Sequence, residues 1–392
     1  MNNERWLLPE GIEELLPPQA AHLEQLRRSM LDLFQRWGYE LVIPPLVEFL
    51  ESLLTGTGND LDLQTFKLTD QLSGKLMGVR ADITPQVARI DAHRMLEREG
   101  PVRLCYAGTV LHTRADGLGG ARSFTQIGAE LYGHAGVESD AEMLLLMLIS
   151  LQLAGIEQLY VDIGHVGIFR ALTQAANLSA EQESALFDAL QRKAVPEIEA
   201  LVSQLDIDGT RRQQFVDLVS LNGGSTVLDE ARKCLAGNNQ ALQALGEIIR
   251  VAEQISSQRP DIQLHFDLAE LRGFNYHTGV VFAAYLPGQG SAIAQGGRYD
   301  EIGKVFGRSR SATGFSADLR ALAVLGAKDL TPSRGIFAPA SDDPNLQDKV
   351  RALREAGECV IAGLPGQSTG AAEAGCDRIL ASDNGKWCVE PV

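Results

Sequence analysis

Two pairs of polar residues are spaced so that each pair would share one face of a strand. Asp82 and Thr84 are two residues apart, so on an extended strand the carboxylate and the hydroxyl point to one face. A carboxylate and a hydroxyl on one face suit a bound ammonium group. Gln126 and Glu130, four residues apart, would also share one face of a strand. The alternative for the first pair is structural, because both residue types can cap the helical pattern TPQVARIDAHRML that follows.

Residues 271–300, LRGFNYHTGVVFAAYLPGQGSAIAQGGRYD, predict a β-hairpin. TGVVFAAYL has the β-branched and aromatic content of a strand, PGQG favours a turn, and SAIAQGGRYD fits a second strand. Arg272 and Asn275 precede the first strand, where polar groups can line a site at the end of a sheet. The Gly296-Gly297 pair would let a ligand or another backbone come close. Without further information, a solvent-facing hairpin of a large α/β domain is an equally good interpretation.

Other segments predict the elements that must position these residues. Apolar residues at helical spacing from Leu23 to Trp37 predict an amphipathic helix, followed by a strand that Pro44-Pro45 interrupts. Residues 65–84 predict a hairpin that turns at Ser73-Gly74, and residues 102–133 predict strand, Gly-rich loop and returning strand.

Two changes of pattern suggest the domain organisation. Helical patterns with polar faces dominate from about residue 175 to about residue 255 and indicate a helical insertion. After about residue 331, strand and helix patterns alternate, one of them a short Ala-rich helix, and predict a small α/β unit. We therefore expect one domain over residues 1–330, which contains the insertion, and a small C-terminal α/β domain over residues 331–392.

Composition argues against several classes of protein. The formal net charge is −16, from 51 acidic and 35 basic residues, and no dense basic run offers a nucleic-acid contact. The five cysteines are scattered without C-x-x-C spacing, so neither a disulfide framework nor a zinc site is indicated. The longest apolar run, MLLLMLISL, is far shorter than the roughly 20 residues that span a bilayer. We expect a cytoplasmic protein that binds no nucleic acid, no membrane, no metal and no cofactor.

Several separate stretches resemble histidyl-tRNA synthetases, which are class II synthetases. RGFNYHTGVVF and GGRYD resemble the RGLDYYxxTVFE and GGRYD pair of that family, and VRADIT resembles its LRPEGT. GARSFTQIGAELYG resembles GRxRxFxQxGxExxG, and GFSADLRAL resembles GFAxGLERL. The resemblance covers about residues 5–325 and implies a mostly antiparallel sheet flanked by helices, dimeric through the first helix and strand. The histidine-binding residues that it implies are Asp82, Thr84, Gln126, Glu130, Arg272 and Tyr276.

At two positions the chain lacks a phosphate-binding arginine of the synthetase pattern. The arginine that grips the α-phosphate in the family falls on His112, and the arginine that holds the γ-phosphate falls on Ala321. Arg320, one residue earlier on a helix, would point elsewhere, since one helical residue is a rotation of roughly 100°. Loss of a preorganised cation typically costs orders of magnitude in phosphate chemistry. The resemblance therefore implies an amino-acid pocket that lacks catalysis.

This combination resembles a paralogous family, the regulatory subunits of ATP phosphoribosyltransferase. The resemblance implies a non-catalytic subunit that is required with a short-form catalytic subunit for the first step of L-histidine biosynthesis. It also implies feedback regulation by histidine and a homodimeric core within a larger complex. The alternatives are a histidyl-tRNA synthetase or another amino-acid ligase on the same fold, and both would need the two missing arginines.

Overall fold

The computed structural model describes residues 6–55, 59–115, 120–271, 273–274, 276–326, 335–367, 370–383 and 386–392. The chain divides into two compact units. One comprises residues 1–16 and 20–327, and the other comprises residues 17–19 and 328–392. Each unit is described by itself below.

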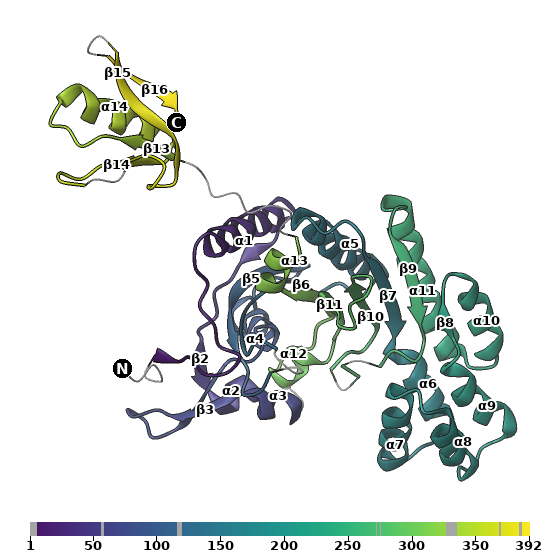
Figure 1. Ribbon diagram of the computed structural model, residues 1–392. Coiled ribbons are helices and arrows are strands. Elements are labelled where there is room, and N and C mark those ends of the chain that lie inside the picture. The colour runs from purple at the N-terminus through teal and green to yellow at the C-terminus, as the bar shows by residue number, and fades with distance from the viewer. Residues whose placement is uncertain are drawn as a thin grey trace. The chain divides into compact units, whose positions relative to one another are not determined.

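A nine-stranded sheet forms the centre of the larger unit, as Figure 1 shows. Its strand order is β1-β5-β6-β12-β11-β10-β7-β9-β8, and only the pairs β1–β5 and β7–β9 are parallel. The strands are β1 (Glu40–Leu41), β5 (Val102–Leu111), β6 (Ser123–Tyr132), β7 (Tyr160–His165), β8 (Asn222–Gly223), β9 (Gln263–Asp267), β10 (Val280–Tyr285), β11 (Ala294–Arg298) and β12 (Ala312–Asp318). The predicted fold class, a mostly antiparallel sheet flanked by helices, is confirmed.

Helices cover both faces of this sheet and separate its side chains into two cores. Helices α1 (Gln19–Arg36) and α5 (Val137–Leu153) share a hydrophobic cluster with Ile127, Ala129 and Leu131 of β6. Helices α4 (Thr84–Arg94) and α12 (Ile302–Val305) share another with Tyr132 of β6. Odd and even positions of β6 thus face opposite cores, as strand geometry requires.

The first helix was predicted correctly from its apolar spacing. Leu26, Met30, Leu33 and Phe34 of α1 are buried, and Gly38 adopts a φ of +82° just after the helix ends. Only glycine enters that conformation without a steric cost, so the chain can turn there into β1.

A separate three-stranded sheet, in the order β2-β4-β3, precedes α4. Its strands are β2 (Val47–Phe49), β3 (Phe66–Thr69) and β4 (Leu76–Val79), and α2 (Leu50–Leu54) and α3 (Asn59–Gln64) lie between β2 and β3. The hairpin prediction for residues 65–84 is right for β3 and β4. It is wrong for Asp82 and Thr84, which are not on a strand. Pro85 suits the first turn of a helix and cannot donate to a sheet ladder, so α4 already begins at Thr84.

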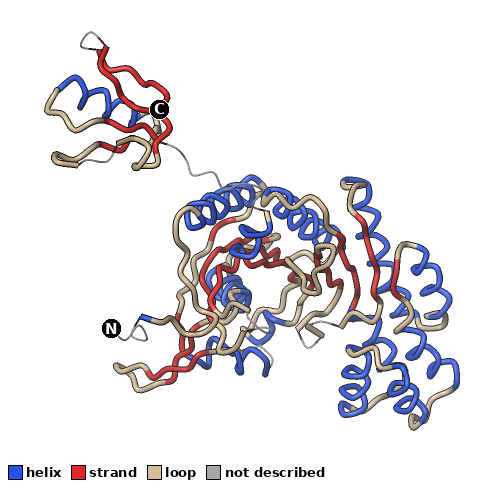
Figure 2. Tube along the Cα trace, viewed as in Figure 1, coloured by secondary structure: helices blue, strands red, loops and turns tan. Residues whose placement is uncertain are grey.

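The helical region follows β7 and packs beside the β7–β9 end of the sheet, where Figure 2 shows a block of helices. Its helices are α6 (Val166–Ala175), α7 (Ala180–Gln191), α8 (Val195–Ser203), α9 (Gly209–Leu218), α10 (Thr226–Cys234) and α11 (Asn239–Gln258). One hydrophobic cluster includes side chains of α1, the sheet and these helices. The helical region therefore shares the core of the sheet.

The smaller unit is a four-stranded sheet in the order β14-β13-β15-β16. Its elements are β13 (Gly335–Ala338), α14 (Pro344–Glu355), β14 (Val360–Ala362), β15 (Cys376–Asp383) and β16 (Lys386–Pro391). The short Ala-rich helix expected before β15 is wrong. Residues 371–375 form a turn, and Gly375 ends it with a φ of +71°. A short segment gains few helical hydrogen bonds for the cost of nucleation, so alanine content alone did not make this one a helix.

In the described part of the chain, no helix combines the length and the apolar character that crossing a membrane requires.

Candidate functional site

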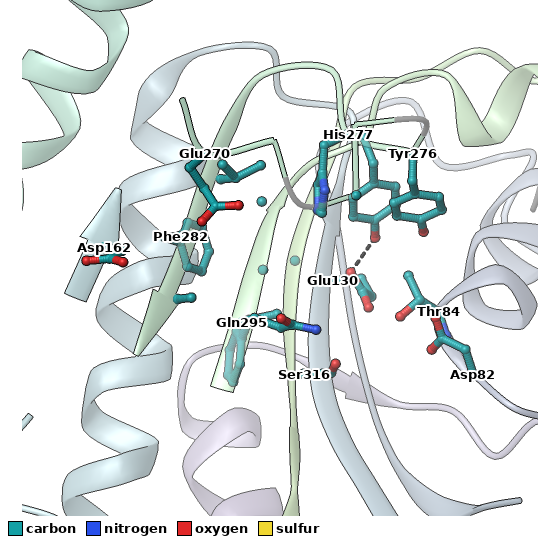
Figure 3. Close-up of a pocket in the computed structure, with 18 residues that line it drawn as sticks. Asp82, Thr84, Glu130, Asp162, Glu270, Tyr276, His277, Phe282, Gln295 and Ser316 are labelled. Atoms are coloured by element: carbon teal, nitrogen blue, oxygen red, sulfur yellow. Dashed lines mark hydrogen bonds between the residues drawn. The ribbon is translucent and has the colours of Figure 1, made fainter. Parts of the chain in front are cut away.

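A pocket of about 190 Å³ lies over the sheet of the larger unit, against β10, β11 and β12 (Figure 3). Glu130, Thr84 and Asp82 lie on one side of it, and Glu270 and Asp162 lie on the other. The lining residues are Asp82, Thr84, Glu130, Asp162, Glu270, Gly273, Tyr276, His277, Val281, Phe282, Ala283, Gln295, Gly296, Gly297, Tyr299, Gly314, Phe315 and Ser316.

Glu130 is the most deeply buried charged group of the pocket, with 1% of its surface exposed. Its Oε1 accepts a hydrogen bond of 3.0 Å from the Tyr106 hydroxyl, and its Oε2 accepts one from the Tyr299 hydroxyl. Burial raises the pKa of Glu130 to about 8, although both tyrosine hydroxyls act to lower that pKa. At neutral pH, burial therefore favours the protonated form of Glu130.

Two stacked tyrosine rings form the wall above Glu130. The rings of Tyr276 and Tyr299 lie 5.1 Å apart with an interplanar angle of 21°. Among the described residues, the buried Tyr276 hydroxyl has no hydrogen-bond partner, and burial raises its pKa well above the usual value. Because an unpaired buried hydroxyl is costly, this group is available to bond a ligand.

Gln126 does not line the pocket but hydrogen-bonds Asp82, which does. Its Nε2 donates to Asp82 Oδ1 at 2.8 Å, and its Oε1 accepts from the Ile83 amide at 2.9 Å. Asp82 Oδ1 also accepts from the Thr84 amide at 3.0 Å, so this carboxylate both caps the start of α4 and faces the pocket. The two interpretations of Asp82, as a cap and as a site residue, are therefore compatible.

The charge of the lining is strongly one-sided. Four carboxyl groups line the pocket, those of Asp82, Glu130, Asp162 and Glu270, of which that of Glu130 favours its protonated form at neutral pH, and none of the described lining residues is Lys or Arg. Asp162 forms an ion pair of 2.8 Å with His265. No group of three or more His, Cys, Asp and Glu in the described part of the chain is arranged to hold a metal ion. Such a lining favours an organic cation over a phosphate.

Glycines make room for this arrangement on the central strands. A Cβ on Gly314 of β12 would overlap Oε2 of Glu130 and come within 2.7 Å of the Ala129 carbonyl oxygen. Gly314 and Glu130 are direct partners across the β6–β12 pair, so a larger residue would displace the carboxylate. The glycine therefore permits the buried pair of Glu130 and Tyr299.

The predicted site residues meet in one place, with two qualifications. Asp82, Thr84, Glu130 and Tyr276 line the pocket, whereas Gln126 supports Asp82 without lining it. Arg272 lies outside the described residues.

The polar lining residues that were not predicted individually are Tyr299, His277, Asp162, Glu270, Gln295 and Ser316. Tyr299 carried a usable signal, since it stands in the same GGRYD stretch that supported the resemblance. The sequence carried no such signal for Asp162 or Glu270. Asp162 comes beside the hairpin only through the pairing of β7 with β10.

The two positions that lack the synthetase arginines lie away from the pocket lining. His112 is buried, and its Nε2 lies 2.9 Å from the Ala81 carbonyl oxygen. Arg320 does not line the pocket either, as predicted, and forms an ion pair with Glu13. Arg122 is held by the same N-terminal segment, because its backbone amide donates to Gly11 and its Nη1 donates to the Glu10 carbonyl oxygen.

Comparison with protein families matches nearly the whole chain. The family model described as histidyl-tRNA synthetase matches residues 11–322. A second model, described as the ATP phosphoribosyltransferase subunit HisZ C-terminal domain, matches residues 333–390.

Curated relatives are similar over their full lengths. The ATP phosphoribosyltransferase regulatory subunit of Thioalkalivibrio sulfidiphilus is 58% identical over 391 residues, covering 99% of each chain. The protein of the same name from Alkalilimnicola ehrlichii is 57% identical, covering 100% of this chain and 98% of the relative.

Solved structures show the same fold. A protein from Bacillus halodurans described as an ATP phosphoribosyltransferase regulatory subunit/histidyl-tRNA synthetase matches with a TM-score of 0.83 and 28% identity. The match covers 94% of this chain and 96% of that one. The histidyl-tRNA synthetase of Nostoc matches with a TM-score of 0.79 at 21% identity, covering 96% of this chain and 91% of that one, which supports the fold alone.

Proposed function

This chain belongs to the family of ATP phosphoribosyltransferase regulatory subunits, and on that premise we propose that its pocket binds L-histidine as a feedback effector. The chain is then a non-catalytic subunit that partners the catalytic subunit of ATP phosphoribosyltransferase, in its short form. The pair carries out the first step of L-histidine biosynthesis in the cytoplasm.

The observation that carries the histidine proposal is the polar end of the pocket. Asp82 offers a carboxylate, the Thr84 hydroxyl lies 3.0 Å from Tyr106, and the Tyr276 hydroxyl is buried and unpaired among the described residues. An ammonium group placed by Asp82 and Thr84 and a ring N–H placed by Glu130 would use these groups together. Each such charge-assisted hydrogen bond in a buried site contributes on the order of 1.5–3 kcal/mol. Arg272 enters the proposal through the family resemblance alone, as a further ligand to histidine.

Activation of histidine as an adenylate is not supported by the same pocket. Polyphosphate must be held by cations that stabilise the developing charge. Positions 112 and 321, where the synthetase pattern has phosphate-binding arginines, are histidine and alanine, and no described lining residue is Lys or Arg. These features favour the regulatory subunit over a histidyl-tRNA synthetase or another amino-acid ligase, although residues 11–322 match the synthetase model.

A homodimeric core is part of the proposal. Strand β1 forms one edge of the nine-stranded sheet. Leu41 of β1 is 48% exposed, and Ile43, two residues later, is 81% exposed. Exposed apolar side chains beside a free strand edge are typical of an association surface. A second copy of the chain is the partner that the family resemblance implies for this surface.

The function can be tested with Asp82→Asn in the complex with the short catalytic subunit. Loss of one charge that pairs with a buried ligand charge typically costs about 2–5 kcal/mol. We expect histidine to bind the isolated variant at least tenfold more weakly by calorimetry, and a matching rise in the histidine concentration that half-inhibits the complex. Asp229→Asn on α10 is the matched control, because this carboxylate is 76% exposed and far from the pocket lining.

Equal inhibition of the wild-type and Asp82→Asn complexes would place the histidine sensor in the catalytic subunit. A separate assay distinguishes the synthetase alternative: the wild-type chain should show no histidine-dependent exchange of pyrophosphate into ATP. Exchange at a rate comparable with that of a synthetase would refute the proposed function.

A further inference from the structure

A pocket loop, residues 268–277, of which the structure describes 268–271, 273–274 and 276–277, follows β9 and contacts the helical region through one aromatic residue. Phe274 is 9% exposed, and its ring lies 5.3 Å from Phe169 of α6 and 5.2 Å from Phe187 of α7. The Arg170 guanidinium lies 4.8 Å above the same ring, and its Nη2 donates 2.7 Å to the Phe274 carbonyl oxygen. Phe274 therefore contacts two helices through its side chain and one through its backbone.

The start of the pocket loop is held by the same region. Lys193, between α7 and α8, forms an ion pair of 2.7 Å with Asp267 at the end of β9. The other oxygen of Asp267 accepts a hydrogen bond of 3.0 Å from the Ala269 amide inside the loop. Since Asp267 is largely buried, this pair fixes the point where the pocket loop leaves the sheet.

The other side of the pocket loop forms part of the pocket. Gly273, Tyr276 and His277 line it, whereas Phe274 does not. The Tyr276 and His277 amides both donate 2.7 Å to the Gly273 carbonyl oxygen, so the turn is tight. Gly273 has a φ of +64°, and a Cβ there would overlap the His277 ring. Tyr276 and Phe274 thus sit two residues apart on one compact turn, with one ring in the pocket wall and the other in the helical core.

We propose that Phe274 is a positioning residue that couples the pocket to helices α6 and α7, so that a bound ligand also orders the helical region. The proposal rests on the proposed function for the identity of the ligand, histidine. A tight turn cannot shift Tyr276 without shifting Phe274, and a ring packed against two other rings resists small continuous movements. Coupling between two sites is reciprocal, so a change in α7 must also alter ligand affinity.

The test begins on the helical side, with the full chain and Phe187→Ala. Phe187 lies on α7 and does not line the pocket, yet we expect this variant to bind histidine about tenfold more weakly by calorimetry, within the usual range of coupling effects. Phe187→Tyr keeps the ring and should restore the affinity. Val227→Ala is the matched control, because it truncates a buried side chain of α10, which packs on α9, α11 and β8.

Amide hydrogen exchange gives a second readout that a purely structural role would not change. Histidine should slow exchange in α7 of the wild type and of Val227→Ala, although no α7 residue lines the pocket. It should not do so in Phe187→Ala.

A third measurement needs no ligand and separates this inference from the proposed function. Without histidine, Phe187→Ala should speed exchange at residues 276–280, and Val227→Ala should not. If the wild type binds no histidine, the proposed function fails and this ligand-free comparison still decides the coupling. A folded Phe187→Ala variant with wild-type affinity and unchanged exchange at residues 276–280 would overturn the inference.

Discussion

At Glu130, burial and hydrogen bonding act on the same carboxyl group in opposite directions. Burial raises its pKa to about 8, and the neighbouring Asp82 charge acts in the same sense, whereas Tyr106 and Tyr299 donate hydrogen bonds that favour the ionised form. The group therefore holds a proton in the folded chain over a pH range in which the unfolded chain has released it. A ligand cation would reverse this preference, since an opposite charge nearby lowers the pKa of a carboxyl group.

Because of Glu130, the unfolding free energy of the chain without ligand should fall as pH rises from about 5 to about 8. Folded Glu130 binds more protons than unfolded Glu130 in this window, so the slope of unfolding free energy with pH is negative. The magnitude of this slope is at most about 1.4 kcal/mol per pH unit. Chemical denaturation of the wild type and Glu130→Gln across this window should show a steeper fall in the wild type. Parallel curves would mean that Glu130 stays ionised.

For single residues, the sequence predicted which side chains lie at the pocket better than it predicted the partners of their hydrogen bonds. One pocket is lined by Asp82, Thr84, Glu130 and Tyr276, which all lie in the stretches that resemble histidyl-tRNA synthetases. Gln126 was expected to touch the ligand, yet both of its polar atoms bond Asp82 and the Ile83 amide. Spacing shows which face of a strand a side chain occupies, but it cannot show which neighbour will take up its hydrogen bonds.

Among the elements, β6 and β12 tolerate substitution least. On the pocket side of the sheet, a glycine of β12 and a carboxyl group of β6 are direct partners across the strand pair. Gly314 faces Glu130 across the pair, and Gly296 and Gly297 of β11 adjoin β12. The hairpins were predictable from the sequence because their strands are close along the chain. The order of the nine strands depends on long-range contacts and was not predicted. The helical pattern that begins at Thr84 matches the start of α4, whereas the strand expected to reach Thr84 ends earlier, because Pro85 favours the first turn of a helix.

Gly314→Ala should test this tolerance. The added methyl would overlap the Glu130 carboxylate and crowd the Ala129 carbonyl, so we expect a loss of about 1–3 kcal/mol in unfolding free energy. Histidine binding should weaken at least tenfold with it. Gly246→Ala is the matched control, since a Cβ at Gly246 of α11 meets no atom within 4 Å. Thermal denaturation and calorimetry would measure both effects, and wild-type binding by Gly314→Ala would contradict the assigned role of Glu130.

For the molecule as a whole, the exposed apolar residues near β1 are the feature that most directly suggests self-association. Leu41 and Ile43 are exposed where the nine-stranded sheet ends, and a second copy would remove them from water.

Ile43→Glu should shift the chain from dimer to monomer in sedimentation experiments, because a charge buried at an apolar interface is costly. Leu153→Glu, which places the same charge on another exposed leucine (42% exposed), should leave the dimer intact. A dimer of unchanged stability in Ile43→Glu would exclude this edge as the interface.

The shared hydrophobic cluster of sheet and helical region limits how this chain can be recombined with its paralogues. Phe169, Phe187 and Phe215 of the helices and Phe274 of the pocket loop belong to or pack against the cluster that also contains Met30 and Phe34 of α1. A chimera that takes residues 166–258 from another protein would break this packing at many points at once, and large-to-small errors in a core cost several kcal/mol each. Functional chimeras should therefore exchange the helices together with residues 268–277. Each hybrid then takes Phe274 and the aromatic residues of α6 and α7 around it from the same parent.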